Sequence, residues 1–600
     1  MIRAHLLRTF KGPNIYGAEP GLLIGLDLDA VDIATACARC EEIGVACRTW
    51  FRNTDGNGDE TAAALKSTRD IARFVAGLSR AALNEIRGDI QSALVVDEDG
   101  RLRIYLGYHH EQVSLLAVAR VLDLVNGTGP ISSVDVERHF AHLWQACQQS
   151  HPDYQAQFVM QGARSRDIPF LPFVPNMRLW KYGWGCNGRV FLESASMADS
   201  WLGAHVAQNK PATKILFEAL GIPFAPHRLV NTETELEAAA VSIGWPCAVK
   251  PSDRGRSIGV TTNVTGLPAL VEAFRAARAN SSAPIMVERF VPGDVYRIMV
   301  VRGRVAWIIR RSPPFVTGDG RRTLQKLVDD HNRRLAEARR PGSFRGETPL
   351  DRDLHDELER QNIRLDDIVP QGVEIRLRKV PLLATGAVHF DVTAKAHPDI
   401  HRMAEMLADA LGFAICGIDY VCEDIEASFT TQGAVLEVNQ TPGLRVPIVA
   451  GIPPEVVGQK ILGDEAARIP VMLVPTEAAR HEAIGRALPI HANDGWVIGG
   501  RCGVGTTPLA GNFAEGCTPE NQLYVQTRQV LRNPLAERLF IVCDPQTVAT
   551  HGLPVDRCDT AIAFVAEPED VLIRILSTYS GTFTQIADMP QLEQALASWR

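Results

Sequence analysis

Two segments of the chain place oxygen-bearing side chains inside apolar runs. In VLEVNQTPGL, residues 435–444, these are Glu437 and Asn439, and in CGIDYVCEDI, residues 416–425, it is Asp419. Side chains two apart on a strand share a face. Adjacent antiparallel strands would therefore set Asp419 opposite Glu437 and Asn439, a set of ligands that suits one or two Mg²⁺ ions holding nucleotide phosphates. The alternative is a half-exposed strand whose polar face meets water.

Three upstream segments carry groups that suit a nucleotide. A strand ends at Lys250, and the loop that follows contains glycines that let backbone N–H groups approach phosphate oxygens. Lys210 begins a helix, and a Pro-Gly hinge follows Glu288, where an adenine edge could bind. An ordinary hairpin and a solvated lysine pair, Lys210 with Lys214 on one polar face, are the alternatives. The residues predicted to bind the nucleotide are Lys210, Lys250, Ser257, Gly259, Glu288, Phe290 and Val291.

Length and composition exclude several classes of protein. The 600 residues exceed one hydrophobic core, so we expect three or four domains. A net charge of -8 disfavours nucleic acid as a partner. The sequence contains no apolar run long enough to predict a membrane span. The first residues also lack the apolar core of a secretory signal, so we expect a cytoplasmic protein. Cys37 and Cys40 fall in a helix-like segment as small apolar residues.

The pattern predicts an α+β region over residues 1–160, with strands at 21–28, 92–98 and 102–108 and helices at 30–44 and 112–126. Residues 161–468 hold the motifs described above. Within them, the charged stretch 321–366 predicts exposed helices. Two histidine pairs, His109 with His110 and His397 with His401, lack an evident third ligand, which favours surface or capping roles over metal binding.

The order of these motifs resembles the ATP-grasp ligases, and more narrowly the cyanophycin synthetases. The resemblance lies in FKGPNIYG, YRIMVV, PPFVTGDGRRTLQKLVDDHN, ATGAVHFDVTAKAHP and EVNQTPGLRVP, and it extends over nearly the whole chain. It implies an α/β and α+β multidomain protein with three parts. These are an N-terminal polymer-holding domain (1–160), an ATP-grasp domain (161–468) with a lid insertion at about 298–395, and a Mur-ligase-like α/β domain (469–600).

The resemblance also implies a reaction. ATP and Mg²⁺ would activate the C-terminal carboxylate of an aspartate-backbone polymer as an acyl phosphate, and an amine would then attack it to form an amide. Arg297, Arg311 and Arg378 would neutralise the transferring phosphoryl group or grip the polymer carboxylate. Asp294 would take the place of the family's sugar-binding acid. We expect a homo-oligomer, a dimer or a tetramer, that binds neither nucleic acid nor membrane.

The C-terminal segment departs from the family pattern. Where that family has a glycine-rich phosphate loop ending in lysine, this chain reads TEAARHE, residues 476–482, without glycine or lysine. The resemblance to the Mur-ligase module also stops early. We therefore expect one working ATP site, as in the truncated branch of the family, which polymerises β-aspartyl-arginine dipeptides. An idle ATP- or polymer-binding scaffold and a full aspartate-plus-arginine synthetase are the alternatives.

The predicted lid departs as well. Val380, Leu382 and Ala384 occupy positions that are polar in the family. Loss of polar contacts changes substrate specificity strongly. The incoming β-aspartyl dipeptide could therefore carry an amino acid other than arginine.

Overall fold

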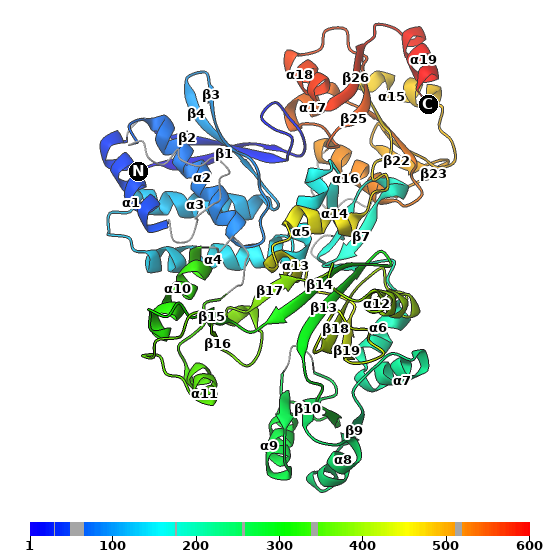
Figure 1. Cartoon of the computed structure of the whole chain (residues 1–600). Coiled ribbons are helices and arrows are strands. Elements are labelled where there is room, and N and C mark those ends of the chain that lie inside the picture. The colour runs from blue at the N-terminus through cyan, green and yellow to red at the C-terminus, as the bar shows by residue number, and fades with distance from the viewer. Residues whose placement is uncertain are drawn as a thin grey trace. The chain divides into compact units, whose positions relative to one another are not determined.

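A computed structural model describes residues 1–28, 31–47, 65–174, 177–254, 258–337, 346–510 and 519–599. The described residues form two compact units, one of residues 1–190 with 464–600 and the other of residues 191–463 (Figure 1). The chain passes from the first unit to the second through β7 (Arg189–Leu192), which β8 (Ala195–Ser196) follows. Within the described ranges, no helix combines the length and the apolar character that crossing a bilayer requires.

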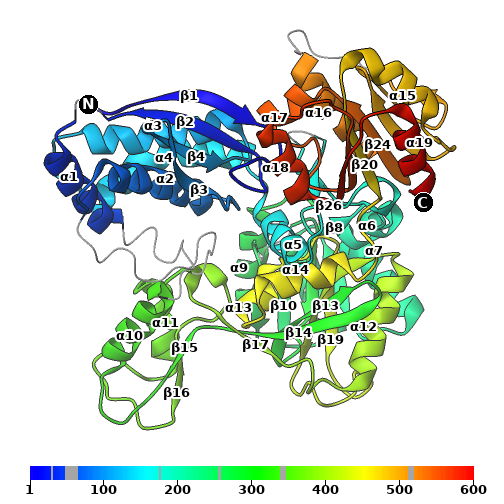
Figure 2. The same ribbon diagram turned by 90° about the horizontal axis from the view of Figure 1, so that it is seen from above.

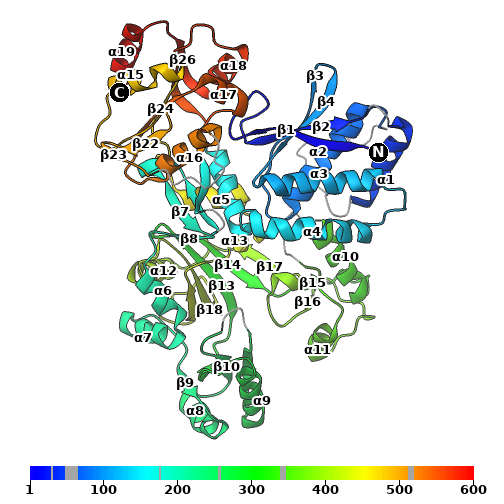
Figure 3. The same cartoon turned by 180° about the vertical axis from the view of Figure 1, so that it is seen from behind.

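The N-terminal part of the first unit is an α+β structure. Its antiparallel sheet has the order β1-β2-β4-β3, and α1 to α4 gather on one face of it (Figure 3). The predicted strands and helices of this region are confirmed, and β1, α2, α4 and α5 are additional elements. The elements are β1 (Arg3–Phe10), β2 (Gly21–Asp27), β3 (Ala93–Glu98), β4 (Arg101–Gly107), α1 (Ile33–Cys47), α2 (Thr68–Glu85), α3 (Glu111–Asn126), α4 (Ser133–Ser150) and α5 (Tyr154–Ser165). A hairpin of β5 (Phe170–Val174) and β6 (Leu179–Tyr182) follows.

The C-terminal part of the first unit is a three-layer α/β module. Its sheet has the order β23-β22-β21-β24-β20-β25-β26, and its strands from β21 to β26 through β24, β20 and β25 run parallel. Helices α15 and α19 pack on one face, and α16, α17 and α18 pack on the other. The elements are β20 (Val471–Pro475), β21 (Asp494–Ile498), β22 (Arg501–Val504), β23 (Thr507–Pro508), β24 (Arg538–Cys543), β25 (Cys558–Ala563), β26 (Ser580–Gln585), α15 (His481–Ala487), α16 (Pro519–Arg532), α17 (Pro545–His551), α18 (Asp570–Tyr579) and α19 (Met589–Ser598).

The second unit contains a small antiparallel sheet of order β11-β10-β12-β9. Its apolar face, with Val249 and Val287, packs on α8 and α9. The opposite face carries the polar side chains of β10 and β12, because strand side chains alternate. The elements are β9 (His227–Val230), β10 (Cys247–Pro251), β11 (Thr261–Val264), β12 (Ile285–Arg289), α8 (Leu236–Ile243) and α9 (Leu267–Arg278).

A larger antiparallel sheet of order β17-β14-β13-β18-β19 forms the centre of the second unit. One face buries Ile298, Ile418 and Tyr420 against α12 and α7. The residues between these, such as Arg297 and Asp419, therefore point to the opposite face. The elements are β13 (Asp294–Val301), β14 (Arg304–Ser312), β17 (Val388–Asp391), β18 (Ile415–Cys422), β19 (Ala434–Asn439), α6 (Trp201–Gln208), α7 (Lys210–Leu220), α12 (Pro398–Ala410), α13 (Arg445–Val449) and α14 (Pro454–Leu462).

A small α/β element lies between β14 and β17 in the chain. It comprises β15 (Phe315–Thr317), α10 (Leu324–Glu337), α11 (Arg352–Arg360) and β16 (Glu374–Arg376) around an apolar core of its own. The charged stretch 321–366 thus forms two helices, as predicted, with their apolar sides buried. Strands β13, β14 and β17 belong to the central sheet, so the inserted element is narrower than the expected 298–395.

We predict that Gly203→Ala lowers the stability of the second unit. A Cβ atom at position 203, in α6, would collide with the carbonyl oxygen of Leu411 at the end of α12. Overpacking of this kind costs about 1–3 kcal/mol, which thermal unfolding would register as a lower midpoint. The control is Gly77→Ala in α2, where the added Cβ meets no atom within 4 Å, so stability should hold or rise. Equal midpoints for wild type and Gly203→Ala would refute this packing.

Candidate active site

The predicted acidic residues meet on one face of the central sheet. In the β18–β19 ladder, Asp419 pairs with Glu437 and Gly417 pairs with Asn439. Residues paired across an antiparallel ladder share a face, and this is the face opposite α12. The Asn439 amide nitrogen donates to Glu437 Oε1 over 3.2 Å, which leaves the amide oxygen as the remaining polar atom. The strand pairing predicted from the sequence is therefore confirmed, and Asp424, beyond the end of β18, accepts from the Glu426 backbone instead.

Arg297 on β13 is the closest cation to this pair. Its Nη2 donates to Asp419 Oδ2 over 3.2 Å, and its Nε lies 2.6 Å from Oδ1. Gly417 makes room for this arrangement, because a Cβ there would lie 2.6 Å from Arg297 Nη1 and 2.8 Å from Pro442 Cβ. Arg297 is thus paired with a carboxylate, and its predicted role in binding the phosphoryl group or the polymer carboxylate stays a prediction.

The two carboxyls have opposite pKa shifts. Burial raises the pKa of Asp419, and although Arg297 opposes this, the neighbouring Glu437 reinforces it. Burial also disfavours ionised Glu437, but the hydrogen bond from Asn439 and the charge of Lys210 outweigh it and lower its pKa. A divalent cation would relieve the repulsion between the two. Two carboxylates and an amide oxygen, all hard ligands, fit Mg²⁺.

Lys250 and Glu288 form the second buried cluster, on the polar face of the small sheet. Lys250 Nζ donates to Glu288 Oε1 over 2.6 Å, and Lys214 Nζ lies 3.7 Å from Oε2. Lys214 was not predicted as a site residue, and the expectation that it shares an exposed face with Lys210 is wrong, since its side chain is only 2 % exposed. Its spacing of three from Phe217, which is fully buried, was the available sequence signal. Burial lowers the pKa of Lys214 to about 8.

Lys210 connects the start of α7 to the expected phosphate loop. Its Nζ donates to the Arg254 carbonyl over 2.5 Å, and burial lowers its pKa. Gly259, at the far end of the loop, adopts φ +69°, which favours glycine. Ser257 lies outside the described residues. Lys210 therefore contacts the first part of the loop, a position from which it could bind a phosphate held by that loop.

Some groups of the hinge between β12 and β13 that were predicted to bind the nucleotide already have partners within the protein. The Phe290 N–H donates to the Pro246 carbonyl over 2.9 Å, so this group is engaged inside the fold. Asp294 lies 3.5 Å from Arg310, which leaves its proposed sugar contact a prediction. Val291 is half-buried beside these residues.

The structure separates the other two predicted arginines. Arg311 lies on the same face as the acidic pair, and burial lowers its pKa while Asp419 opposes that shift. Arg378 is buried in the inserted element, where its Nη1 lies 2.7 Å from Asp351 and its Nη2 donates to the Pro349 carbonyl over 2.8 Å. These contacts tie Arg378 to its own element.

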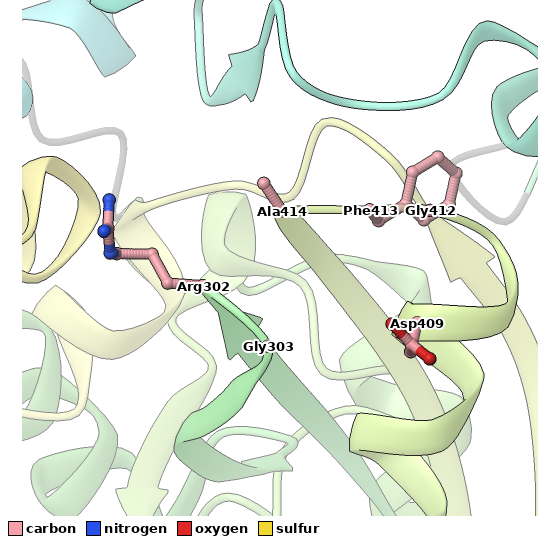
Figure 4. A pocket seen from close by; sticks show the side chains of 6 residues that line it. All are labelled: Arg302, Gly303, Asp409, Gly412, Phe413 and Ala414. Atoms are coloured by element: carbon pink, nitrogen blue, oxygen red, sulfur yellow. The ribbon is translucent and has the colours of Figure 1, made fainter.

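The remaining metal candidates have structural contacts. His397 caps α12 through a hydrogen bond from the Asp399 N–H, and Cys37, Cys40 and Cys47 are buried in α1. Among the described side chains, no group of three His, Cys, Asp or Glu residues could hold a metal. A hollow of about 420 Å³ lies apart from the acidic face, lined by Arg302 and Gly303 of the β13–β14 turn and by residues from Asp409 to Ala414 (Figure 4). None of the predicted site residues lines it.

Sequence comparison relates the chain to known ligases. A family model described as the D-ala D-ala ligase C-terminus matches residues 216–309. A cyanophycin synthetase of Synechocystis sp. is 26% identical over 457 residues, which is 74% of this chain and 52% of that relative. The glutathione biosynthesis bifunctional protein of Streptococcus mutans is 29% identical over 228 residues, 36% of this chain and 29% of that relative.

Structural similarity is weaker. The solved structure of a bifunctional glutathione synthetase from Pasteurella multocida is 13% identical, with a TM-score of 0.39, and covers 71% of this chain and 79% of that chain. The chain spans about half the length of the curated cyanophycin synthetases that it matches.

We predict that Glu437→Gln weakens Mg²⁺-dependent ATP binding at least tenfold. The change keeps the shape of the side chain but removes one of two carboxylate ligands, and charge is what a hard cation requires. Isothermal titration of ATP with and without Mg²⁺ measures the effect. Asp424→Asn is the control, because that carboxylate serves only the turn after β18. An unchanged Mg²⁺ dependence in Glu437→Gln would remove this carboxylate from the metal site.

We predict that Lys214→Met changes how stability depends on pH. The folded pKa of Lys214 is about 8 against 10.5 for the free group, so between these values the unfolded chain binds more protons. The wild type therefore gains stability as pH rises from 8 towards 10.5, by up to about 3 kcal/mol. Lys214→Met should lack this gain in urea unfolding at pH 7.5 and 9.5, whereas Lys460→Met, an exposed control on α14, should keep it. Parallel pH profiles for wild type and Lys214→Met would contradict the burial of a charged lysine.

Proposed function

This chain is a relative of the cyanophycin synthetases with an ATP-grasp core, and on that premise we propose that it is an ATP-dependent dipeptide polymerase. It would join β-aspartyl dipeptides, β-aspartyl-arginine or a related one, through the aspartate backbone. The observation that carries this proposal is the contrast between its two potential nucleotide sites. The ATP-grasp face has its lysines and acidic residues. In the C-terminal module, the segment 476–482 lies where a phosphate loop would be expected, and its side chains bond back to the fold; we call this segment the closed connection.

The contacts after β20 support the loss of the second site. Thr476 Oγ1 donates to the Phe564 carbonyl over 3.0 Å, and Arg480 Nη1 donates to the same oxygen over 3.2 Å. The Arg480 guanidinium also lies 4.4 Å from the Phe564 ring centroid, and His481 Nε2 lies 3.0 Å from the Thr476 carbonyl. Side chains thus occupy the start of a segment that has no glycine to cradle a triphosphate. Without that site, the chain would need its second amino acid already attached.

The residues of the first site suit carboxylate activation. Lys210 and Lys250 would bind the nucleotide phosphates, and Asp419, Glu437 and Asn439 would hold Mg²⁺. When bound, the cation would neutralise phosphate charge and align the γ-phosphate. A carboxylate oxygen of the polymer terminus would attack the γ-phosphorus and displace ADP. The dipeptide α-amine would then attack the carbonyl carbon, lose a proton and displace phosphate, a sequence that needs positioning and charge neutralisation.

Phosphate release tests the proposal. The full chain would be incubated with ATP, Mg²⁺ and a short aspartate-backbone primer, together with β-aspartyl-arginine, another β-aspartyl dipeptide, or free aspartate plus arginine. We expect turnover only with a dipeptide, and a polymer that lengthens by one dipeptide for each phosphate. Glu437→Gln provides the inactive control.

Two outcomes would contradict the proposal. Turnover with free aspartate and arginine, giving an arginine-bearing polymer, would mean that the closed connection after β20 does not disable the second site. Nucleotide binding without phosphate release in any mixture would favour the scaffold alternative. A homo-oligomeric state remains a prediction that the mass of the intact particle in solution would check.

A further inference from the structure

The segment 440–446, which we call the strap, crosses the acidic face of the central sheet. It leaves β19 at Asn439, on one edge of the sheet, and enters α13, which packs on β17 and β14 at the other edge. Figures 1 and 2 both show α13 beside β17 and away from β19. Residues 440–444 of the strap precede α13, and Arg445 and Val446 form the first turn of that helix. Pro442 lies against Gly417 of β18, and the Val446 carbonyl lies 3.3 Å from His389 Nδ1 of β17. The strap therefore passes over the face that carries the acidic pair.

Two contacts fix the strap to the fold. Ser194 Oγ, itself fully buried, donates to the Pro442 carbonyl over 2.7 Å, and Pro442 lies against Gly417 beside Arg297. At the far end, His389 Nδ1 lies 3.3 Å from the Val446 carbonyl, so this nitrogen donates. The strap also buries Leu444 completely, whereas Thr441 is exposed. Its path is thus set by contacts at the beginning, middle and end.

His389 brings the end of the strap to Arg311. It lies on β17, is 5 % exposed, and pairs in register with Arg311 across the β14–β17 ladder. Arg445, the first residue of α13, precedes Val446 and is half-buried. Because His389 contacts Val446 and neighbours Arg311, the two arginines come to the same corner of the acidic face.

Two of the three arginines predicted to bind the phosphoryl group or the polymer carboxylate are paired with carboxylates of the protein. Arg297 is paired with Asp419, and Arg378 is paired with Asp351 in the inserted element. Arg311 lies on the acidic face, and Arg445 begins α13, which packs on β17 and β14. Guanidinium groups bind carboxylates through two parallel N–H donors, which fixes orientation as well as charge.

We infer that Arg445, held by the strap, joins Arg311 in binding the C-terminal carboxylate of the aspartate backbone, and that His389 is the positioning residue that sets the strap. This inference rests on the proposed function for the identity of the carboxylate. Binding at this corner would place the carboxylate on the same face as the metal ligands, next to the phosphate that it attacks. Arg311 and Arg445 are 134 positions apart in the chain (445 − 311), a separation that conceals the pair from sequence analysis.

Primer binding tests the role of Arg445. The probes are a short α-linked aspartate oligomer and the same oligomer with its C-terminus amidated, titrated into the protein with a non-hydrolysable ATP analogue and Mg²⁺. The wild type should bind the acid at least tenfold more tightly than the amide. Arg445→Ala should lose that discrimination, Arg445→Lys should keep part of it, and neither should change the Kd of the nucleotide. Arg402→Ala is the control, because Arg402 is exposed on α12, which packs on the opposite face.

The His389 variants test positioning separately. His389→Ala should raise the KM for the primer severalfold and leave the KM for ATP unchanged, and His389→Asn, which restores an N–H donor, should recover most of the loss. Full acid-over-amide discrimination in folded Arg445→Ala would overturn the inference. So would equal primer KM values in wild type and His389→Ala. Because primer binding needs no turnover, it remains informative where the polymerase proposal fails in the phosphate assay.

Discussion

A buried carboxyl beside a half-buried one is the constraint on which the second unit depends. Asp419 and Glu437 face each other across β18 and β19 in an interior where like charges repel strongly. Arg297 and Asn439 compensate part of the cost, and Gly417 is needed so that Arg297 can reach. Asp419 also links β18 to β13 through Arg297, and a ligand of positive charge would relieve the remaining repulsion between the two carboxyls. A divalent cation with its phosphates is such a ligand.

In the small sheet of the second unit, a carboxylate compensates the charge of two lysines. Glu288 lies between Lys250 and Lys214, so one buried carboxylate supports two cations. Lys210 lies at the nearby loop. Under the proposed function, these lysines would bind the nucleotide phosphates, and a metal ion would join the phosphates to Asp419 and Glu437.

Local sequence patterns predicted the strand pairing at the site. Contacts between residues far apart in the chain could be seen only in the structure. The alternation in residues 416–422 and 434–439 sufficed to pair Asp419 with Glu437, since strand geometry has a strict period of two. Lys214 was misplaced because a spacing of four from Lys210 does not say which side of a helix is buried. The pairing of Arg378 with Asp351 was not predicted, because Asp351 is 27 residues upstream and charge partners across a loop leave no periodic signal. His389 contacts the Val446 carbonyl only because the strap crosses the sheet, a long-range contact that leaves no local pattern in the sequence.

The C-terminal module has a three-layer α/β fold although the segment after β20 lacks the glycines of a phosphate loop. Its parallel strands and both helical layers remain, while the segment after β20 is filled by Thr476, Arg480 and His481. Packing of strands and helices constrains the fold of the module independently of the sequence in this segment.

Oxygen transfer tests the central claim most directly. A primer labelled with ¹⁸O in its C-terminal carboxylate would be extended with ATP and a dipeptide, and the released phosphate analysed by mass spectrometry. Activation of that carboxylate as an acyl phosphate predicts one ¹⁸O atom in phosphate for each amide bond formed. Unlabelled phosphate released with an elongated polymer would contradict carboxylate activation at this site.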